Sequence, residues 1–119
     1  METKVTHMFT GSDGESHFKD IMIPFENSIV DIGQSSEIMK ASGLIFGELE
    51  SNYEQSWHNA PRRQFIITLE GEGEYEIGDG TKRRFGPGDI LLAEDTTGRG
   101  HKSRDVNSQP RKIIVVTLD

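Results

Sequence analysis

The sequence has no cysteine, so its 119 residues can form neither a disulfide nor a thiolate metal site. It also lacks the roughly 18 consecutive apolar residues that a membrane-spanning helix needs. Its opening, METKVTHMFTGSDGE, contains no continuous apolar stretch of the kind found in signal peptides. These absences exclude a disulfide-stabilised scaffold and predict a cytoplasmic protein with a single domain.

Basic residues are scarce in the first half of the chain. Residues 1–60 hold three basic and ten acidic side chains, residues 61–119 hold ten of each, and the net charge is −7. Nucleic acids and anionic membranes bind to positively charged surfaces, so this acidity argues against both as main partners. A local cluster of arginines would still suit a small anion.

Helical periodicity is weak, and the chain instead shows short runs rich in β-branched and aromatic residues between Gly, Asp, Asn and Pro. Gly78-Asp79-Gly80 predicts a hairpin turn, and FGPGD at 85–89 predicts another tight turn. About eight strands at this spacing predict an all-β sandwich or barrel. The clearest runs are 64–71, 73–80, 81–85, 89–94 and 112–119, and the weaker ones are 5–10, 17–26 and 43–50.

Two of these runs, QFIITLEG at 64–71 and KIIVVTLD at 112–119, are apolar on both faces. A strand of an antiparallel sheet with one face in water alternates apolar and polar residues instead. The barrel core would cover one face, and a partner subunit or an N-terminal segment would cover the other. We therefore expect a homodimer.

Two histidines occur in patterns that resemble the motifs of small single-domain cupins of the RmlC-like jelly-roll family. In the first motif, His58 and Gly71 stand at the expected positions. Ala60 stands in place of the second histidine, Gln64 in place of the glutamate, and Asn52 in place of an earlier glycine. The first motif is therefore degenerate at its metal ligands.

The second motif supplies His101, with Gly98 three residues earlier. The resemblance covers residues 40–118 and implies a double-stranded β-helix, the cupin jelly-roll barrel. It also implies that residues 1–39 form N-terminal strands or an arm, and that residues 40–119 form the barrel that carries both motifs.

In cupins with intact motifs, three histidines and a carboxylate hold a divalent metal. The resemblance therefore makes His58, His101 and Gln64 the candidate ligands of an iron, manganese, nickel or zinc ion. Two imidazoles and a neutral amide oxygen form a weak cage for such an ion. We favour a barrel without a strongly held metal.

The leading hypothesis is that the barrel binds a small polar or anionic molecule, with His58, Gln64 and His101 lining the site. Arg62 closely follows His58, and Arg99 closely precedes His101. Guanidinium groups bind carboxylates and phosphates through paired hydrogen bonds. In the alternative interpretation, the nearby basic side chains, including Arg63, Lys102 and Arg104, point to solvent and pair with acidic neighbours such as Glu94, Asp95 and Asp105.

Other functions stay open because one fold carries many activities. The resemblance allows a metal-dependent enzyme of the dioxygenase, isomerase or lyase type, with His58 and His101 as ligands. It also allows a metal-free enzyme in which either histidine moves a proton, as in sugar-nucleotide epimerases of this fold. A non-catalytic assembly or scaffold protein is the third alternative, and the two-faced strands favour it.

Several further charged residues have weaker assignments. The segment around His17 could fold over the barrel mouth and bring this histidine to the site. Candidate acid or base groups just before the first motif are Glu48, Glu50 and Tyr53. The alternating glutamates predict one solvated strand face, formed by Glu70, Glu72, Glu74 and Glu76. Cross-strand ion pairs with these glutamates are expected of Lys82, Arg83 and Arg84.

Overall fold

A computed structural model describes residues 1–119 as twelve β-strands without a helix. The all-β prediction is confirmed. No helix that could span a membrane is present. The strands are, in chain order, β1 (Glu2–Thr10), β2 (Ser16–Pro24), β3 (Asn27–Ile29), β4 (Gly33–Ser35), β5 (Gly43–Leu49), β6 (Glu54–His58), β7 (Gln64–Glu70), β8 (Gly73–Glu76), β9 (Lys82–Phe85), β10 (Ile90–Glu94), β11 (His101–Asp105) and β12 (Arg111–Thr117).

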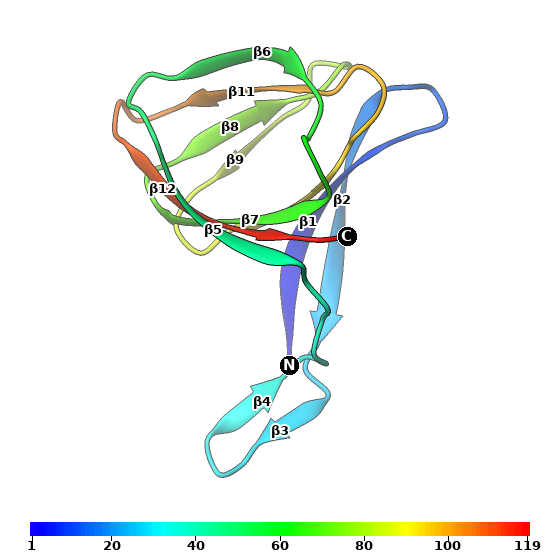
Figure 1. Cartoon of the computed structure of the whole chain (residues 1–119), viewed down its shortest axis with the longest axis vertical. Coiled ribbons are helices and arrows are strands. Elements are labelled where there is room, and N and C mark those ends of the chain that lie inside the picture. The colour runs from blue at the N-terminus through cyan, green and yellow to red at the C-terminus, as the bar shows by residue number, and fades with distance from the viewer.

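Two sheets form the walls of a barrel (Figure 1). The six-stranded sheet has the order β2-β1-β10-β7-β12-β5, and the four-stranded sheet has the order β6-β11-β8-β9. Only β1 and β10 pair in parallel, and every other neighbouring pair is antiparallel. The arrangement confirms the jelly-roll barrel that the sequence predicted.

All eight predicted runs form strands. The sequence did not predict four strands, namely β3, β4, β6 and β11. Their residues are mostly polar, so the alternation of apolar and polar residues that identifies a strand in a sequence is missing. Two of these unrecognised strands, β6 and β11, carry the histidines of both motifs.

Apolar side chains of the strands form one cluster inside the barrel and another on the outer face of the six-stranded sheet. Inside the barrel, Tyr75 packs edge-to-face on Phe85 with ring centroids 5.3 Å apart. The interior cluster consists of Met8, Ala60, Tyr75, Ile77, Phe85, Leu91 and Ala93. On the outer face a second cluster centres on Val5, Phe65 and Leu92. Residues of β1 and β2 extend this cluster along the same sheet, so the N-terminal strands enlarge the outer face and do not cover it.

The predicted solvated face of glutamates is wrong. Gly71 has a φ of +76° and interrupts the chain between β7 and β8, so the alternating glutamates do not lie on one strand. Glu74 is buried and accepts hydrogen bonds from Arg84 and Arg104. Burial alone would raise the pKa of the Glu74 carboxyl, but these two guanidinium groups outweigh it and lower the pKa.

The predicted cross-strand ion pairs form in part. Arg84 lies opposite Glu74 in the β8–β9 register and pairs with it at 3.3 Å. Arg83 instead crosses to β2, where it pairs with Asp20. The register therefore satisfies one of the expected pairs and leaves the second arginine free for another sheet.

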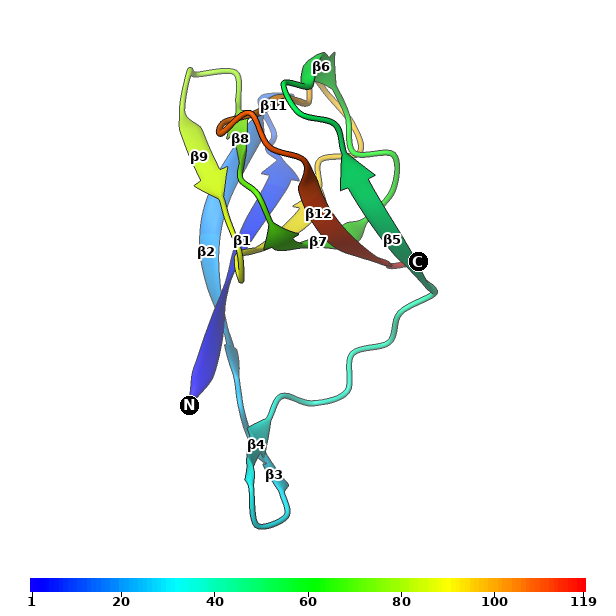
Figure 2. The same cartoon turned by 90° about the vertical axis from the view of Figure 1, so that its left-hand side faces the viewer.

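Residues 25–42 project from the barrel as an arm, which contains the separate β3–β4 hairpin and the linker to β5 (Figure 2). Strands β1 and β2, by contrast, belong to the six-stranded sheet. The expected division of the chain at residues 1–39 and 40–119 stays a prediction about domain organisation. The start of β1 and the end of β2 already extend beyond the barrel, and the arm continues from them (Figures 1 and 2).

Candidate functional site

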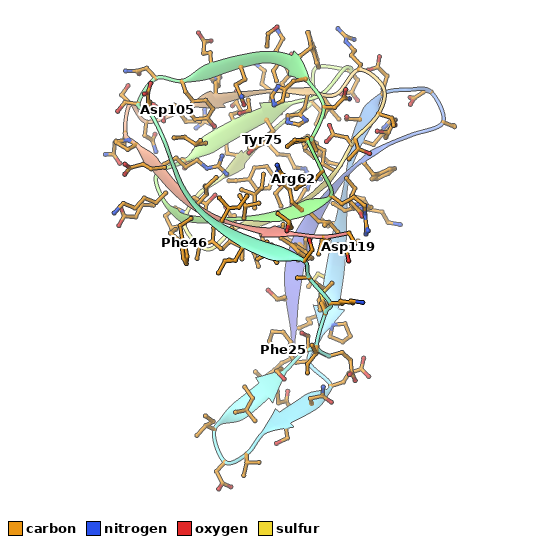
Figure 3. All side chains as sticks on the ribbon, in the orientation of Figure 1. Phe25, Phe46, Arg62, Tyr75, Asp105 and Asp119 are labelled. Atoms are coloured by element: carbon orange, nitrogen blue, oxygen red, sulfur yellow. The ribbon has the colours of Figure 1, made fainter.

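A cavity of about 380 Å³ lies between the two sheets. Half of its 14 lining residues are hydrophobic. Among the polar ones are His58, Gln64 and His101, the three residues that the sequence analysis placed at a site. Figure 3 shows Tyr75, another lining residue, inside the barrel between the sheets. A concave and partly apolar space with a few convergent polar groups is typical of a small-molecule site.

The two histidines are brought together by neighbouring strands. His58 of β6 lies directly opposite His101 of β11, so both side chains are on the same face of the sheet. Their ring centroids are 4.4 Å apart. Gly100 permits this approach, because it has a φ of +81° and a Cβ there would lie 2.0 Å from the carbonyl oxygen of His58.

His101 is held by a buried carboxylate that the sequence analysis assigned to the surface. The Nδ1 of His101 lies 2.7 Å from Oδ2 of Asp95, which is fully buried. The hydroxyl of Ser16 donates a hydrogen bond of 2.7 Å to the same oxygen. Because the carboxylate accepts from Nδ1–H, the imidazole is fixed in orientation and Nε2 is its free nitrogen. The interpretation of Asp95 as an exposed ion-pair partner is wrong.

His58 is oriented by the backbone. Its Nδ1 lies 2.7 Å from the carbonyl oxygen of Ser56. A carbonyl oxygen only accepts, so Nδ1 carries the proton and Nε2 of the neutral ring keeps a lone pair. Both histidines therefore use Nδ1 for the fold and keep Nε2 for another partner.

Gln64 is buried in the cavity wall, and its amide oxygen accepts a hydrogen bond of 2.9 Å from Nη1 of Arg62. Figure 3 shows Arg62 at the opening of the barrel. Arg62 therefore contacts the cavity lining at Gln64, although it is not itself a lining residue. This amide oxygen, the predicted metal ligand of Gln64, is therefore already hydrogen-bonded to a guanidinium group.

A tightly held divalent metal does not fit these residues. No group of three or more His, Cys, Asp or Glu side chains converges in the chain. Two imidazoles fall short of the three protein ligands usual in catalytic sites. The guanidinium of Arg62 beside Gln64 would also oppose a second cation. The donor set therefore differs from the one that intact cupin motifs provide.

Two other arginines near the motifs, Arg63 and Arg99, do not line the cavity. Arg63 pairs with Glu94, as the alternative interpretation expected. The guanidinium of Arg99 lies over the Trp57 ring, 4.1 Å from its centroid, and 3.5 Å from Glu15. Arg99 is not among the cavity-lining residues, so it gives the site no direct contact.

The remaining candidates also lie outside the lining. His17 contacts Asp13 in the turn between β1 and β2, and its neighbour Ser16 is the residue that reaches the site. The carboxylates at positions 48 and 50 do not line the cavity. The hydroxyl of Tyr53 lies 3.3 Å from the hydroxyl of Ser103, which does.

A buried arginine that the sequence analysis did not single out lies beside the cavity. Arg111 is fully buried, and its guanidinium donates to the hydroxyl groups of Thr68, at 2.8 Å, and Tyr75, at 3.1 Å. No carboxylate pairs with it. Burial raises the pKa of the Tyr75 hydroxyl, which therefore stays protonated. The interior thus holds an arginine whose positive charge no acidic side chain neutralises.

Comparison with known proteins identifies the fold. No protein-family model matches the chain, and no curated protein matches it significantly. One similar structure is an uncharacterized conserved protein with a double-stranded beta-helix domain from Klebsiella pneumoniae, at a TM-score of 0.50 and 22% identity over 63% of this chain and 64% of that chain. Another is a sugar phosphate isomerase from a cupin superfamily from Silicibacter pomeroyi, at a TM-score of 0.52 and 18% identity over 90% of this chain and 60% of that chain.

The chain spans less than two thirds of the length of both of these structures. At these identities the likeness shows the shared fold and leaves the activity open. The fold is the one that the histidine motifs indicated.

Proposed function

We propose, from the premise that the chain is a cupin-type double-stranded β-helix, that it binds a small anionic molecule in the barrel without a strongly held metal. The observation that carries this proposal is the hydrogen bond between His101 and the buried Asp95, beside the 380 Å³ cavity. A histidine held in this way presents Nε2 to the cavity at a defined angle. His58 and Gln64 complete the polar part of the lining.

The charges near the cavity support an anionic ligand. Arg111 is buried without an acidic partner, and Arg62 reaches the cavity wall through Gln64. Charges interact strongly across a poorly hydrated interior, so a negatively charged ligand would offset the guanidinium of Arg111. The apolar half of the lining would contact the carbon skeleton of the ligand.

A metal assay and a ligand screen test this proposal. Untagged protein is dialysed against a chelator, analysed for metals, and then screened by thermal shift with inorganic phosphate, simple carboxylates and sugar phosphates. Sugar phosphates belong in the screen because one structure with this fold is described as a sugar phosphate isomerase. A ligand at 100 times its Kd stabilises the folded state by about 2.7 kcal/mol, which raises Tm by several degrees.

The variant His101→Ala is expected to abolish the thermal shift. The matched control His7→Ala removes a histidine that pairs with Glu94 outside the cavity, and it should leave the shift unchanged. Stoichiometric metal that survives the chelator would contradict the proposal and favour the metal-dependent enzyme. No shift with any anion would contradict it in favour of a scaffold.

A metal-free proton transfer is a second candidate function, and the Asp95–His101 pair favours it. A carboxylate behind an imidazole stabilises the protonated ring, so Nε2 can accept a proton from a bound molecule and return it. For a hydroxy-carbonyl compound, the proton would leave the carbon beside the carbonyl and the electron pair would move to the carbonyl oxygen.

Solvent exchange tests this second function. A sugar phosphate that gives a thermal shift is incubated in deuterated buffer, and NMR measures the loss of its exchangeable C–H signal. Exchange that Asp95→Asn slows by roughly 10-fold or more would support His101 as the base. A ligand that binds without C–H exchange would contradict proton transfer and would support binding as the only function.

A further inference from the structure

The arm, residues 25–42, carries large apolar side chains that its own chain leaves in water. Val30 is 78% exposed, Ile32 is 83% exposed and Ile38 is 98% exposed. The arm lies at one end of the 46 Å long axis of the molecule, away from the barrel in both views (Figures 1 and 2). Buried apolar surface is what stabilises an ordered segment, so the arm lacks its stabilising contact.

The hairpin inside the arm also lacks stabilising contacts. Strands β3 and β4 have three residues each and form a two-stranded sheet of their own. An isolated two-stranded hairpin is at best marginally stable in water. Five of the six strand residues are exposed. The hairpin therefore needs a surface on which to pack.

The outer face of the six-stranded sheet offers such a surface at its β5 side. The strand register places Phe46 opposite Ile114, and Ile114 opposite Ile67, so the three side chains form an apolar row on the outer face. Leu44 and Val116 pair in the adjacent row. Phe46 is 76% exposed and Leu44 is 56% exposed.

The β5 strand is also an edge of the sheet. Apolar edge strands that stay open promote association, and natural proteins normally cover them. Two uncovered apolar surfaces therefore exist on the same chain, namely a projecting arm and a sheet face. The arm points away from the barrel, so this face is available to another copy.

We propose that the arm of one copy packs on the outer sheet face around Leu44 and Phe46 of a second copy, and that the second arm returns the contact in a twofold dimer. A twofold interface pairs each surface with its complement twice, which satisfies both arms and both sheet faces. The inference names the surface behind the expected homodimer, and it does not depend on a ligand in the cavity.

A charge-exchange experiment tests the interface. One variant carries Val30→Lys and Ile32→Lys in the arm, and the other carries Leu44→Glu and Phe46→Glu on the sheet face. Analytical ultracentrifugation should show a wild-type dimer. It should also show that each variant dimerises more weakly by roughly 100-fold or more, because charges are then buried against an apolar surface.

An equimolar mixture of the two variants should restore the dimer. In the mixed dimer, the wild-type arm of the face variant packs on the wild-type face of the arm variant. In the other contact, the lysines of the arm variant meet the glutamates of the face variant. The matched control is Met22→Lys. Met22 is exposed and lies on the face of the β1–β2 hairpin opposite to the outer apolar cluster, so this variant should remain dimeric. Circular dichroism confirms that each variant is folded.

Three results would overturn the inference. They are a monomeric wild-type protein, variants that dimerise as well as the wild type, and a mixture of folded variants that stays monomeric. Larger open assemblies in place of a dimer would also overturn it, because a twofold interface closes on itself.

Discussion

Two buried charges, Asp95 and Arg111, lie near Tyr75 in the barrel, and they are compensated in different ways. The Tyr75 ring is 5.4 Å from the ring of His101, the partner of Asp95, and the Tyr75 hydroxyl is 3.1 Å from Arg111. The carboxylate of Asp95 accepts hydrogen bonds from the imidazole of His101 and from the hydroxyl of Ser16. The side-chain hydrogen bonds of Arg111 go only to hydroxyl groups.

This difference separates two ways of stabilising a buried charge. An arginine stays protonated, so the positive charge of Arg111 is permanent, and its hydrogen bonds go to neutral hydroxyl groups. Asp95 is instead hydrogen-bonded to a histidine that lines the cavity, so this contact both stabilises the carboxylate and orients the site.

Breaking the Asp95 contact is expected to have the largest effect. Asp95→Ala leaves the Nδ1–H of His101 and the hydroxyl of Ser16 without their acceptor in a buried place. Removal of one partner of a buried ionic contact typically costs about 3–5 kcal/mol. Urea unfolding measures this loss. The control Glu94→Ala removes the neighbouring, partly exposed carboxylate, and it should cost about 1 kcal/mol or less. Equal losses for both variants would contradict the assignment.

The arginine side of the comparison is tested by Arg111→Lys. The substitution keeps the positive charge and loses the planar fork that reaches Thr68 and Tyr75 together. We expect a loss of about 2 kcal/mol, measured by urea unfolding. The control Lys112→Ala, on the adjacent exposed position, should stay within about 0.5 kcal/mol of the wild type. If Arg111→Lys left the free energy of unfolding unchanged, the positive charge alone would be what stabilises this part of the interior.

Ser16→Ala tests the contacts of Asp95 with a smaller change than Asp95→Ala. It removes one of the two hydrogen bonds to Oδ2 and leaves His101 in contact with the carboxylate. We expect a loss of about 1–2 kcal/mol in the free energy of unfolding. The orientation of His101 should persist, so the anion-dependent thermal shift of the wild type should remain. Loss of that shift would mean that Ser16 also positions the site.

The carboxylate of Glu74, whose arginine partners are exposed, provides the smallest effect. Its pKa is lowered below the ordinary value of 4.5, because the guanidinium groups of Arg104 and Arg84 outweigh burial. A lowered folded-state pKa adds stability above the unfolded pKa, and this stability is lost as the pH falls through the folded pKa. Both arginines are half-exposed, so the contribution is about 0.2–1 kcal/mol.

Urea unfolding between neutral pH and acid measures this contribution. The variant Glu74→Gln should lose less stability than the wild type as the pH falls below 4.5. Identical pH profiles would contradict the assignment of Glu74 as a paired carboxylate.

The sequence predicted the fold well because the information lies in local patterns. The long strands alternate or are apolar throughout, and the spacing of His58 and His101 resembles known motifs. Strands β6 and β11 have no such apolar pattern, and they were placed only through their histidines. Local patterning therefore identifies the strands that carry apolar core residues, and it misses β11, whose buried side chains are polar.

The partners of the histidines were not predictable in the same way. Asp95 follows an apolar strand and has arginines nearby in sequence, so it reads as a surface residue. Ser16 contacts it across 79 positions of chain, which no local pattern can reveal. Arg111 did offer a signal, because it shares a strand face with Ile113 and Val115, two residues of the cavity lining. A period-two reading of that strand would have placed the arginine inside.

The parallel pairing of β1 with β10 also determines when the protein can fold during synthesis. β1 ends at Thr10, and β10 begins only at Ile90. At roughly 5–20 residues per second, a ribosome needs about 4–16 s to make the chain between them. During that time the β1–β2 hairpin can form locally, but Val5 and Met8 have no sheet to enter. Until β10 has been made, these two apolar residues therefore lack the neighbouring strand that buries them in the folded protein.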